Sequence, residues 1–355
     1  MKTNRPYVTI SKESKLKELM EALQKNMDNI KKFDGIAGIM LDGGMSRGYA
    51  DYLSEIDVVI FLHEKEFQRY KEEKTPIALG ITKMEGYLYD IKVLNYEEEW
   101  RKEYDSIALW DMSYAKILYD TKEELKSLFD RKLKTVRDVS TAEGLMFEAW
   151  WNYKLAGDIW LHREDILQGH YCLNNAVKPL LSALFIANSE YIPHDKWLIH
   201  MSRTLEWKPL PYDELLQGIL YTGDMNLESL YKRQKCLEHF WNAINDKLCG
   251  MLDFNNGLKL MHRGVYQNLE RIIEKDSFTL SEWNEFSSIS SLNYEPLFSF
   301  TEIKDGMVII DRNKLNTLGE KELYDWFYDV VKAVRQESMM NNEKLSKNNV
   351  GDNSY

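Results

Sequence analysis

The strongest constraint on the fold comes from two short apolar runs, Ile36–Leu41 and Ile56–Leu62, which are separated by a glycine-containing turn. Their isoleucine, valine and leucine content favours β-strands. Because both runs are apolar on both faces, we expect them to lie inside a sheet that is covered on each side. The sequence therefore predicts a layered core near the N-terminus.

Helical and strand patterns flank these two runs. Residues 11–32 repeat apolar side chains at helical spacing, and residues 64–74 favour a more polar helix. A third strand is predicted over residues 86–95, where successive side chains alternate between two faces. The predicted order is helix, strand, strand, helix, strand.

The pattern changes after residue 122, where long helical periodicities replace strands. Pro179 interrupts one of them and predicts a kink or a fresh helix start. Residues 307–310 favour one short strand. The predicted helices of this part cover residues 141–161, 172–188, 227–248, 258–273 and 321–335.

We therefore expect an α+β fold in two domains, which the length of 355 residues permits. A domain with a short mixed sheet and flanking helices covers residues 1–135, and an all-helical domain covers residues 136–338. Residues 339–355 lack apolar periodicity and are predicted to form a disordered tail. The active site is expected between the two domains.

Composition and charge exclude several classes of function. The 46 basic and 57 acidic residues give a net charge of −11, which opposes sequence-independent binding to nucleic acid. The three cysteines lack the spacing of a zinc site or a disulfide framework. No run approaches the roughly 18 apolar residues that span a bilayer, so we expect a cytoplasmic protein without a membrane partner.

Chemistry-bearing residues concentrate between positions 41 and 62. Gly43 and Gly44 end the first strand, and their missing side chains permit positive φ and close approach of an anion to the backbone. Glu55 and Asp57 stand two residues apart at the start of the second strand, so their side chains leave the same face. Two such carboxylates repel each other unless a cation intervenes, and Mg²⁺, which also takes phosphate oxygens, suits them.

A third carboxylate lies on the third predicted strand. Asp90 can complete a two-metal clamp with Glu55 and Asp57, or it can take the proton of an attacking hydroxyl. Lys92 lies on the same face and either binds a phosphate or holds Asp90 ionised.

The pattern resembles the polymerase-beta-like nucleotidyltransferase superfamily, in which a glycine turn precedes two carboxylates spaced by one residue and a third on a later strand. The resemblance covers roughly residues 30–100. The first carboxylate is usually Asp in that superfamily, and Glu55 departs from the pattern. The matching positions are Gly43, Gly44, Ser46, Arg47, Gly48, Ser54, Glu55 and Asp57.

The resemblance implies attack of a substrate hydroxyl on the α-phosphorus of a nucleoside triphosphate, with ATP as the donor and Mg²⁺ as the cofactor. Glu55 and Asp57 would hold the metal, and Asp90 would act as ligand or base. Ser46 and the glycine turn would cradle the phosphates, and Arg47 would support the turn or touch phosphate. The acceptor implied is a small molecule, such as an aminoglycoside or a lincosamide-like antibiotic.

The second half offers weaker candidates. Residues 191–197, together with Asn175 and Lys178, look like the helical part of transferases that adenylylate antibiotics. Lys178 and Lys196 either contact nucleotide phosphate or are ordinary surface charge. Glu148 lies among aromatic residues that either pack the core, the interpretation we favour, or shape an acceptor pocket.

Three alternatives remain at this point. A protein-modifying, antitoxin-like adenylyltransferase would use the same fold and the same reaction. A catalytically silent nucleotide-binding protein is made conceivable by Glu55. A polymerase or tRNA-tailing enzyme is disfavoured by the acidic balance and the lack of a basic, aromatic-rich surface.

Overall fold

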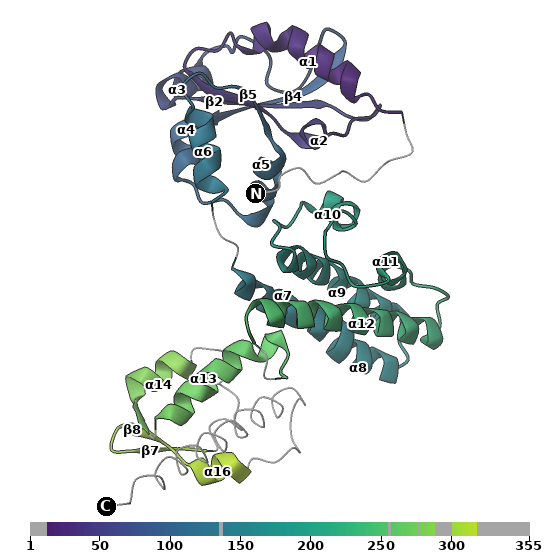
Figure 1. Cartoon of the computed structure of the whole chain (residues 1–355), viewed down its shortest axis with the longest axis vertical. Helices are drawn as coiled ribbons and strands as arrows, with labels where there is room; N and C mark the ends of the chain where they lie inside the picture. Colours follow the sequence, from purple (N-terminus) through teal and green to yellow (C-terminus); the bar gives the residue numbers. More distant parts are fainter. Residues whose placement is uncertain (1–12, 135–137, 255–256, 276, 288–299, 318–355) are drawn as a thin grey trace, which may run out of the picture.

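The computed structural model describes residues 13–134, 138–254, 257–275, 277–287 and 300–317 (Figure 1). Its N-terminal part is built on a five-stranded sheet with the strand order β3-β4-β2-β1-β5. Only the β2–β4 pair is parallel, so the sheet is mixed. The strands are β1 (Ile36–Leu41), β2 (Ile56–Leu62), β3 (Gly80–Met84), β4 (Tyr87–Asn95) and β5 (Lys116–Tyr119).

Helices cover both faces of this sheet. Helix α1 (Leu16–Ile30) packs its apolar stripe onto the face that contains Ile39, Val58 and Ile91. Leu125 of α6 (Glu124–Lys132) packs onto the other face, which contains Val59 and Phe61. Burial on both faces explains why β1 and β2 are apolar at nearly every position. The shorter helices are α2 (Gly43–Ser46), α3 (Glu64–Glu72) and α4 (Tyr96–Arg101).

The sequence-based expectations for this part hold in outline. The strands over Ile36–Leu41 and Ile56–Leu62 are confirmed with the predicted bounds, and the strand predicted over residues 86–95 is β4. The helices predicted over residues 11–32 and 64–74 correspond to α1 and α3. Two strands, β3 and β5, were missed, and both lie at edges of the sheet.

The next part of the chain is helical. Residues 141–161, predicted as one helix, form α7 (Ala142–Trp150), a π-helical segment η2 (Trp151–Ala156) and α8 (Gly157–His162). Helix α9 (Ile166–Ala187) runs unbroken through Pro179, so the fresh start predicted there does not occur. The remaining helices are α10 (Asp195–Ser202), α11 (Tyr212–Leu220), α12 (Leu227–Met251) and α13 (Arg263–Glu274), with short turns η1 (Val139–Thr141) and η3 (Leu260–His262).

A small three-stranded sheet follows these helices, with the order β6-β8-β7. The α+β class is confirmed. The C-terminal part contains this small sheet and is therefore not all-helical as predicted. Of its three strands, the sequence predicted only the one over residues 307–310, which is β8. The helix predicted over 321–335 and the tail over 339–355 lie outside the described residues. The elements are β6 (Ser277–Thr279), α14 (Leu280–Ser287), β7 (Thr301–Lys304), β8 (Met307–Ile310) and α16 (Arg312–Thr317).

Helix α5 (Ser106–Tyr114) belongs to both parts of the molecule. Leu109 and Trp110 are buried in the helical core, whereas Met112 packs with the sheet. The predicted boundary near residue 135 falls on residues 135–137, which lie outside the described residues. Among the described helices, none is long and apolar enough to cross a membrane.

Candidate active site

Three aspartates form a row across neighbouring strands at one end of the sheet. Asp57 on β2 and Asp90 on β4 are register partners, so their side chains leave the same face. Asp42 follows β1, and its backbone N–H donates to the Asp57 carbonyl over 3.0 Å. Leu41 pairs with Val58, so the same register places Asp42 beside Asp57. Neighbours in such a row have Cβ atoms about 5 Å apart.

The glycine turn lies directly against this row. Gly43 has a φ of +67°, and a Cβ added to it would lie 1.8 Å from the Asp57 Oδ2 atom. A Cβ on Gly44 would lie 3.1 Å from the Tyr49 carbonyl oxygen. Any side chain at position 43 would therefore displace the Asp57 carboxylate.

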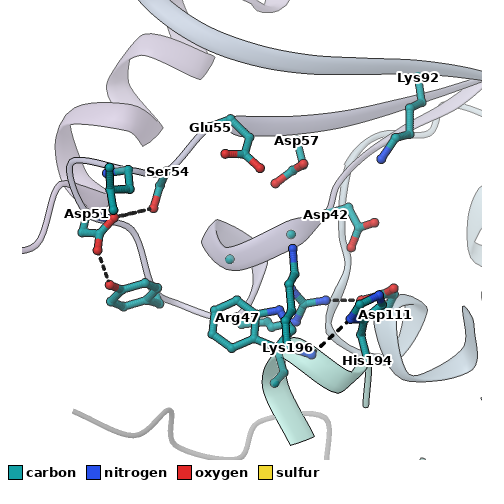
Figure 2. Close-up of a pocket in the computed structure, with 15 residues that line it drawn as sticks. Asp42, Arg47, Asp51, Ser54, Glu55, Asp57, Lys92, Asp111, His194 and Lys196 are labelled. Atoms are coloured by element: carbon teal, nitrogen blue, oxygen red, sulfur yellow. Dashed lines mark hydrogen bonds and ion pairs between the residues drawn. The ribbon is translucent and has the colours of Figure 1, made fainter. Parts of the chain in front are cut away.

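An open pocket of about 330 Å³ surrounds these groups, which is enough for part of a nucleotide-sized ligand. Figure 2 shows Glu55, Asp57 and Asp42 on one side of it, with Lys196 extending toward them from α10. The pocket thus brings a cluster of carboxylates and several cations together. Its lining residues are Asp42, Gly43, Gly44, Arg47, Tyr49, Asp51, Leu53, Ser54, Glu55, Asp57, Lys92, Asp111, His194, Lys196 and Trp197.

Asp57 carries the most perturbed carboxyl group of the pocket. Burial raises its pKa to about 6, with further contributions from the negative charges of Glu55 and Asp42. The Asp42 Oδ1 atom is buried and accepts no hydrogen bond from any described residue. Negative charge is thus concentrated at the end of β1 and β2, and the charge of Lys92 offsets part of it.

Asp90 is compensated differently. Its carboxylate is 21% exposed and lies 3.0 Å from the Lys92 Nζ atom. Burial acts to lower the pKa of Lys92, but the hydrogen bond and the charge of Asp90 outweigh it and raise the pKa. Lys92 lines the pocket and Asp90 does not. Asp90 therefore shares the face of Asp57, with an ammonium group as its present partner.

Arg47 and Ser46 contribute to the turn itself. The Ser46 hydroxyl donates to the Gly43 carbonyl over 2.8 Å, and the residue is 4% exposed. The Arg47 guanidinium forms an ion pair with Asp111 of α5 and lies over the Trp110 ring. Burial raises the pKa of Asp111, the charge of Asp42 adds to this, and Arg47 opposes it.

The two candidate lysines of the helical part differ in position. Lys196 lines the pocket at the start of α10. Lys178 of α9 lies outside the lining and forms an exposed ion pair of 2.8 Å with Asp195. The structure therefore brings Lys196 to the carboxylates, while Lys178 contacts the beginning of the same helix.

The loop between the turn and β2 is organised by Asp51. Its carboxylate accepts hydrogen bonds from the Tyr49 hydroxyl over 2.5 Å and from the Leu53 N–H over 2.8 Å. The hydrogen bond to Asp51 raises the pKa of Tyr49 to about 12. Ser54 donates to the same carboxylate over 3.2 Å, so its hydroxyl holds the loop together.

The fit of a divalent cation can be judged from these atoms. Within the described ranges, no three His, Cys, Asp or Glu side chains converge as a ready-made metal site. A Mg²⁺ ion needs only one or two carboxylates, since phosphate oxygens and water complete its shell. The uncompensated Asp42 oxygen and the raised pKa of Asp57 match that requirement.

Several lining residues were not predicted from the sequence. Asp42 directly precedes Gly43, and its place after a buried strand was the available signal. Asp111 lies on a helix distant in sequence, and no local pattern marks it, whereas Trp197 ends the segment 191–197 that the resemblance had marked. The ring of His194 accepts a hydrogen bond of 3.2 Å from the Lys196 N–H and caps α10.

No protein-family model and no curated protein matches the chain. Among solved structures, a nucleotidyltransferase-like protein from Exiguobacterium sibiricum aligns with 82% of this chain and 98% of its own, at 10% identity and a TM-score of 0.39. At that identity and TM-score the likeness bears on neither activity nor substrates.

Proposed function

We propose that the chain is a metal-dependent nucleotidyltransferase, which moves a nucleoside monophosphate from a triphosphate such as ATP to a hydroxyl group. The observation that carries this proposal is the contact between the positive-φ Gly43 and the Asp57 carboxylate. It places backbone suited to a phosphate against a carboxylate whose pKa is raised by burial and by the negative charges of Glu55 and Asp42.

Each side of the pocket has a part in this reaction. The Gly43 and Gly44 backbone and the Lys196 ammonium bind the triphosphate, and Ser46 supports the turn through its bond to Gly43. Asp57, together with Glu55 or Asp42, holds the cation. Bound Mg²⁺ supplies neutralisation of the charge that develops on the phosphate oxygens.

The chemical step needs a base for the acceptor hydroxyl. Asp90 takes this proton after Lys92 turns from it toward a phosphate, and the acceptor oxygen then bonds to the α-phosphorus. The bond from the α-phosphorus to the bridging oxygen breaks, and pyrophosphate leaves. The protein contributes orientation and charge neutralisation more than covalent chemistry.

The geometry favours a compact acceptor over a peptide that pairs with the sheet edge. β3 is the edge strand next to β4, so a peptide added to it would lie two strand spacings from Asp90. That is about 10 Å, which exceeds the reach of most hydroxyl side chains. We therefore propose a small-molecule acceptor, and antibiotics with free hydroxyls are the first compounds to test.

A second candidate is a catalytically silent nucleotide-binding protein. The observation that favours it is the 3.0 Å ion pair of Asp90 with Lys92, which occupies the proposed base. If this pair persists when a nucleotide binds, the carboxylate cannot accept the proton of a hydroxyl. Binding without turnover is the signature of this alternative.

The two candidates are separated by measuring binding and turnover on the same samples. Wild type, Asp57→Asn and Asp34→Asn are incubated with each nucleoside triphosphate, Mg²⁺ and either an antibiotic panel or cell lysate. Asp34 is an exposed carboxylate that pairs with Arg69 over 2.8 Å, and it serves as the matched control. Pyrophosphate release and intact-mass shifts of acceptors report turnover, and calorimetry reports nucleotide binding.

We expect wild type and Asp34→Asn to release pyrophosphate and Asp57→Asn to release none while remaining folded. A mass shift on a small molecule supports the proposed acceptor class, and one on a protein overturns it in favour of a protein-modifying enzyme. Nucleotide binding without release under all conditions establishes the silent alternative. If wild type neither binds a nucleotide nor releases pyrophosphate, both candidate functions are overturned.

A further inference from the structure

Arg47 is a buried cation at the junction of three segments. Its side chain is 3% exposed, and its guanidinium carbon lies 4.2 Å from the centre of the Trp110 ring and 5.9 Å from that of Trp197. One guanidinium N–H group donates to the Asp111 carboxylate. Both aromatic contacts fall within the range in which a cation is attracted to a ring.

These partners come from different parts of the chain. Arg47 directly follows α2 and the glycine turn, Trp110 and Asp111 belong to α5, and Trp197 belongs to α10. The Arg47 N–H donates to the Gly44 carbonyl over 3.1 Å, so the side chain is anchored one step from the proposed phosphate-binding backbone. A shift of the guanidinium would therefore be felt by the turn.

The other end of this junction leads to the pocket lysine. Trp197 is the immediate neighbour of Lys196 in the first turn of α10. The segment before α10 is also tied to α5, because the Ile192 N–H donates to the Ser106 hydroxyl over 2.8 Å. Helix α5 thus contacts both Arg47 and the segment that leads into α10.

We infer that Arg47 is a positioning residue that couples the Gly43–Gly44 turn to α10, so that the turn and Lys196 are held in one arrangement over the carboxylates. The coupling between the two segments stands on the contacts of Arg47, and its consequence for nucleotide binding rests on the proposed function. Its guanidinium acts through its contacts with Trp197 and Asp111.

The structural part of this inference is tested on the full chain without a nucleotide, by hydrogen exchange. Arg47→Lys keeps the positive charge but loses the planar guanidinium, which stacks on aromatic rings and can form two parallel hydrogen bonds with a carboxylate. It should accelerate exchange in α10, and Trp197→Leu should accelerate exchange in the turn over residues 43–49. Arg131→Lys is the matched control, since the guanidinium carbon of Arg131 on α6 lies 4.9 Å from the centre of the Trp100 ring on α4, and neither residue lines the pocket.

For each variant, hydrogen exchange is measured in the segment that does not contain the substitution. Faster exchange there indicates coupling between the segments, because a purely local disturbance would be confined to the substituted segment. Because the two variants approach the junction from opposite sides, unfolding of one leaves the other to decide. Unchanged exchange in the distant segment for a folded variant would overturn the inference. The same holds if Arg131→Lys accelerates exchange in α10 as much as Arg47→Lys does.

The functional part is tested with a non-hydrolysable ATP analogue and Mg²⁺ in a double-mutant cycle. Arg47→Lys and Lys196→Ala should each raise the dissociation constant about tenfold, the size of a lost cation–π or phosphate contact. The dissociation constant of the double variant should rise by clearly less than the product of the two single increases, because Arg47 positions Lys196 and acts on the nucleotide through it. If the increase in the double variant equals the product of the two single increases, Arg47 does not act through Lys196.

Failure of the proposed function gives a different result. If wild type does not bind the analogue, the nucleotide assignment fails, while the exchange experiment still decides whether Arg47 couples the turn to α10. If the analogue binds and exchange in both distant segments is unchanged, the nucleotide assignment stands and the coupling fails.

Discussion

Asp57 of β2 and Asp90 of β4 are register partners in the parallel pair at the centre of the sheet. Their side chains project from the same face, and the row continues to Asp42 beyond the end of β1. Only Asp90 has a lysine partner, at 3.0 Å. The charge of Lys92 also offsets part of the charge of Asp57, which lies with Asp42 next to the glycine turn.

The role of Asp90 is tested by Asp90→Asn. Loss of a general base should lower kcat about 100-fold or more and leave the affinity for the nucleotide analogue unchanged. Glu85→Gln, an exposed carboxylate in the turn before β4, is the control and should change neither quantity. A loss of nucleotide affinity with an unchanged kcat would show that Asp90 acts through Lys92 instead.

The pKa of Asp57 predicts how stability depends on pH. Since its pKa is about 6 in the folded state, above the value of an unfolded Asp, the folded state binds more protons between about pH 4 and pH 6. Stability without metal should therefore fall as the pH rises through this window and stay lower above it. Urea midpoints at pH 5 and pH 7, measured in EDTA, give the difference.

Asp57→Asn should abolish most of that pH dependence and raise the stability at pH 7 by about 1 kcal/mol, because Asp57 is still reached by solvent. Mg²⁺ should stabilise wild type at pH 7 and leave Asp57→Asn unaffected. A wild-type protein whose stability rises between pH 5 and pH 7 in EDTA would contradict the assignment.

Gly43→Ala should disrupt the site through a direct collision, because the new Cβ would lie 1.8 Å from the Asp57 carboxylate. Gly48 is the matched control, since its φ is +86° and a Cβ there meets nothing within 4 Å. Both substitutions should cost about 1–2 kcal/mol of stability through backbone strain.

Only Gly43→Ala should also abolish divalent-cation and nucleotide binding, which calorimetry can measure. Equal losses of binding in Gly43→Ala and Gly48→Ala would show that the collision with Asp57 is irrelevant to the site.

Glu55 departs from the aspartate that is usual in the superfamily that the motif resembles. If it helps Asp57 to hold the cation, Glu55→Gln should weaken Mg²⁺ binding at least tenfold, since one charged ligand becomes neutral. Glu55→Asp should keep binding within a few-fold of wild type. Metal titrations of both variants test this, and an unaffected Glu55→Gln would transfer the ligand role to Asp42.

The two lysines of the helical part should separate in function. Lys196→Ala should raise the dissociation constant of the nucleotide about tenfold, as expected for a lost phosphate contact. Lys178→Ala removes an exposed ion pair with Asp195 and should change affinity less than about threefold, since such pairs contribute little. Equal effects would place the phosphates nearer α9 than the pocket suggests.

The fold was predictable where burial imposes a pattern on the sequence. β1 and β2 are covered by helices on both faces, so nearly all of their residues are apolar and the bounds are sharp. β3 lies at an edge, and its Ile81 is 78% exposed, so no alternation marks it as a strand. The short edge strand β5 was missed for the same reason.

The candidate site divides in the same manner. Gly43, Gly44, Glu55 and Asp57 could be predicted because their spacing along one chain segment determines where they point. Asp111 could not, because α5 is buried on two sides and shows no one-sided apolar stripe. Its contact with Arg47 joins residues 64 positions apart and forms only when α5 packs beside the glycine turn.

The hairpin that delivers Asp90 tolerates no change in length. β3 and β4 are joined by two residues with positive φ, Glu85 and Gly86, which tie the strands tightly together. One residue inserted between this turn and Asp90 would move the Asp90 side chain to the sheet face that α1 covers, and Tyr89 would move to the opposite face. Segment 73–79, which precedes β3, is under no such restriction, since lengthening a surface connection adds little entropy cost. Changes in length can therefore accumulate ahead of Gly80, whereas one codon inserted between Gly86 and Asp90 moves the Asp90 carboxylate off the face that it shares with Asp57.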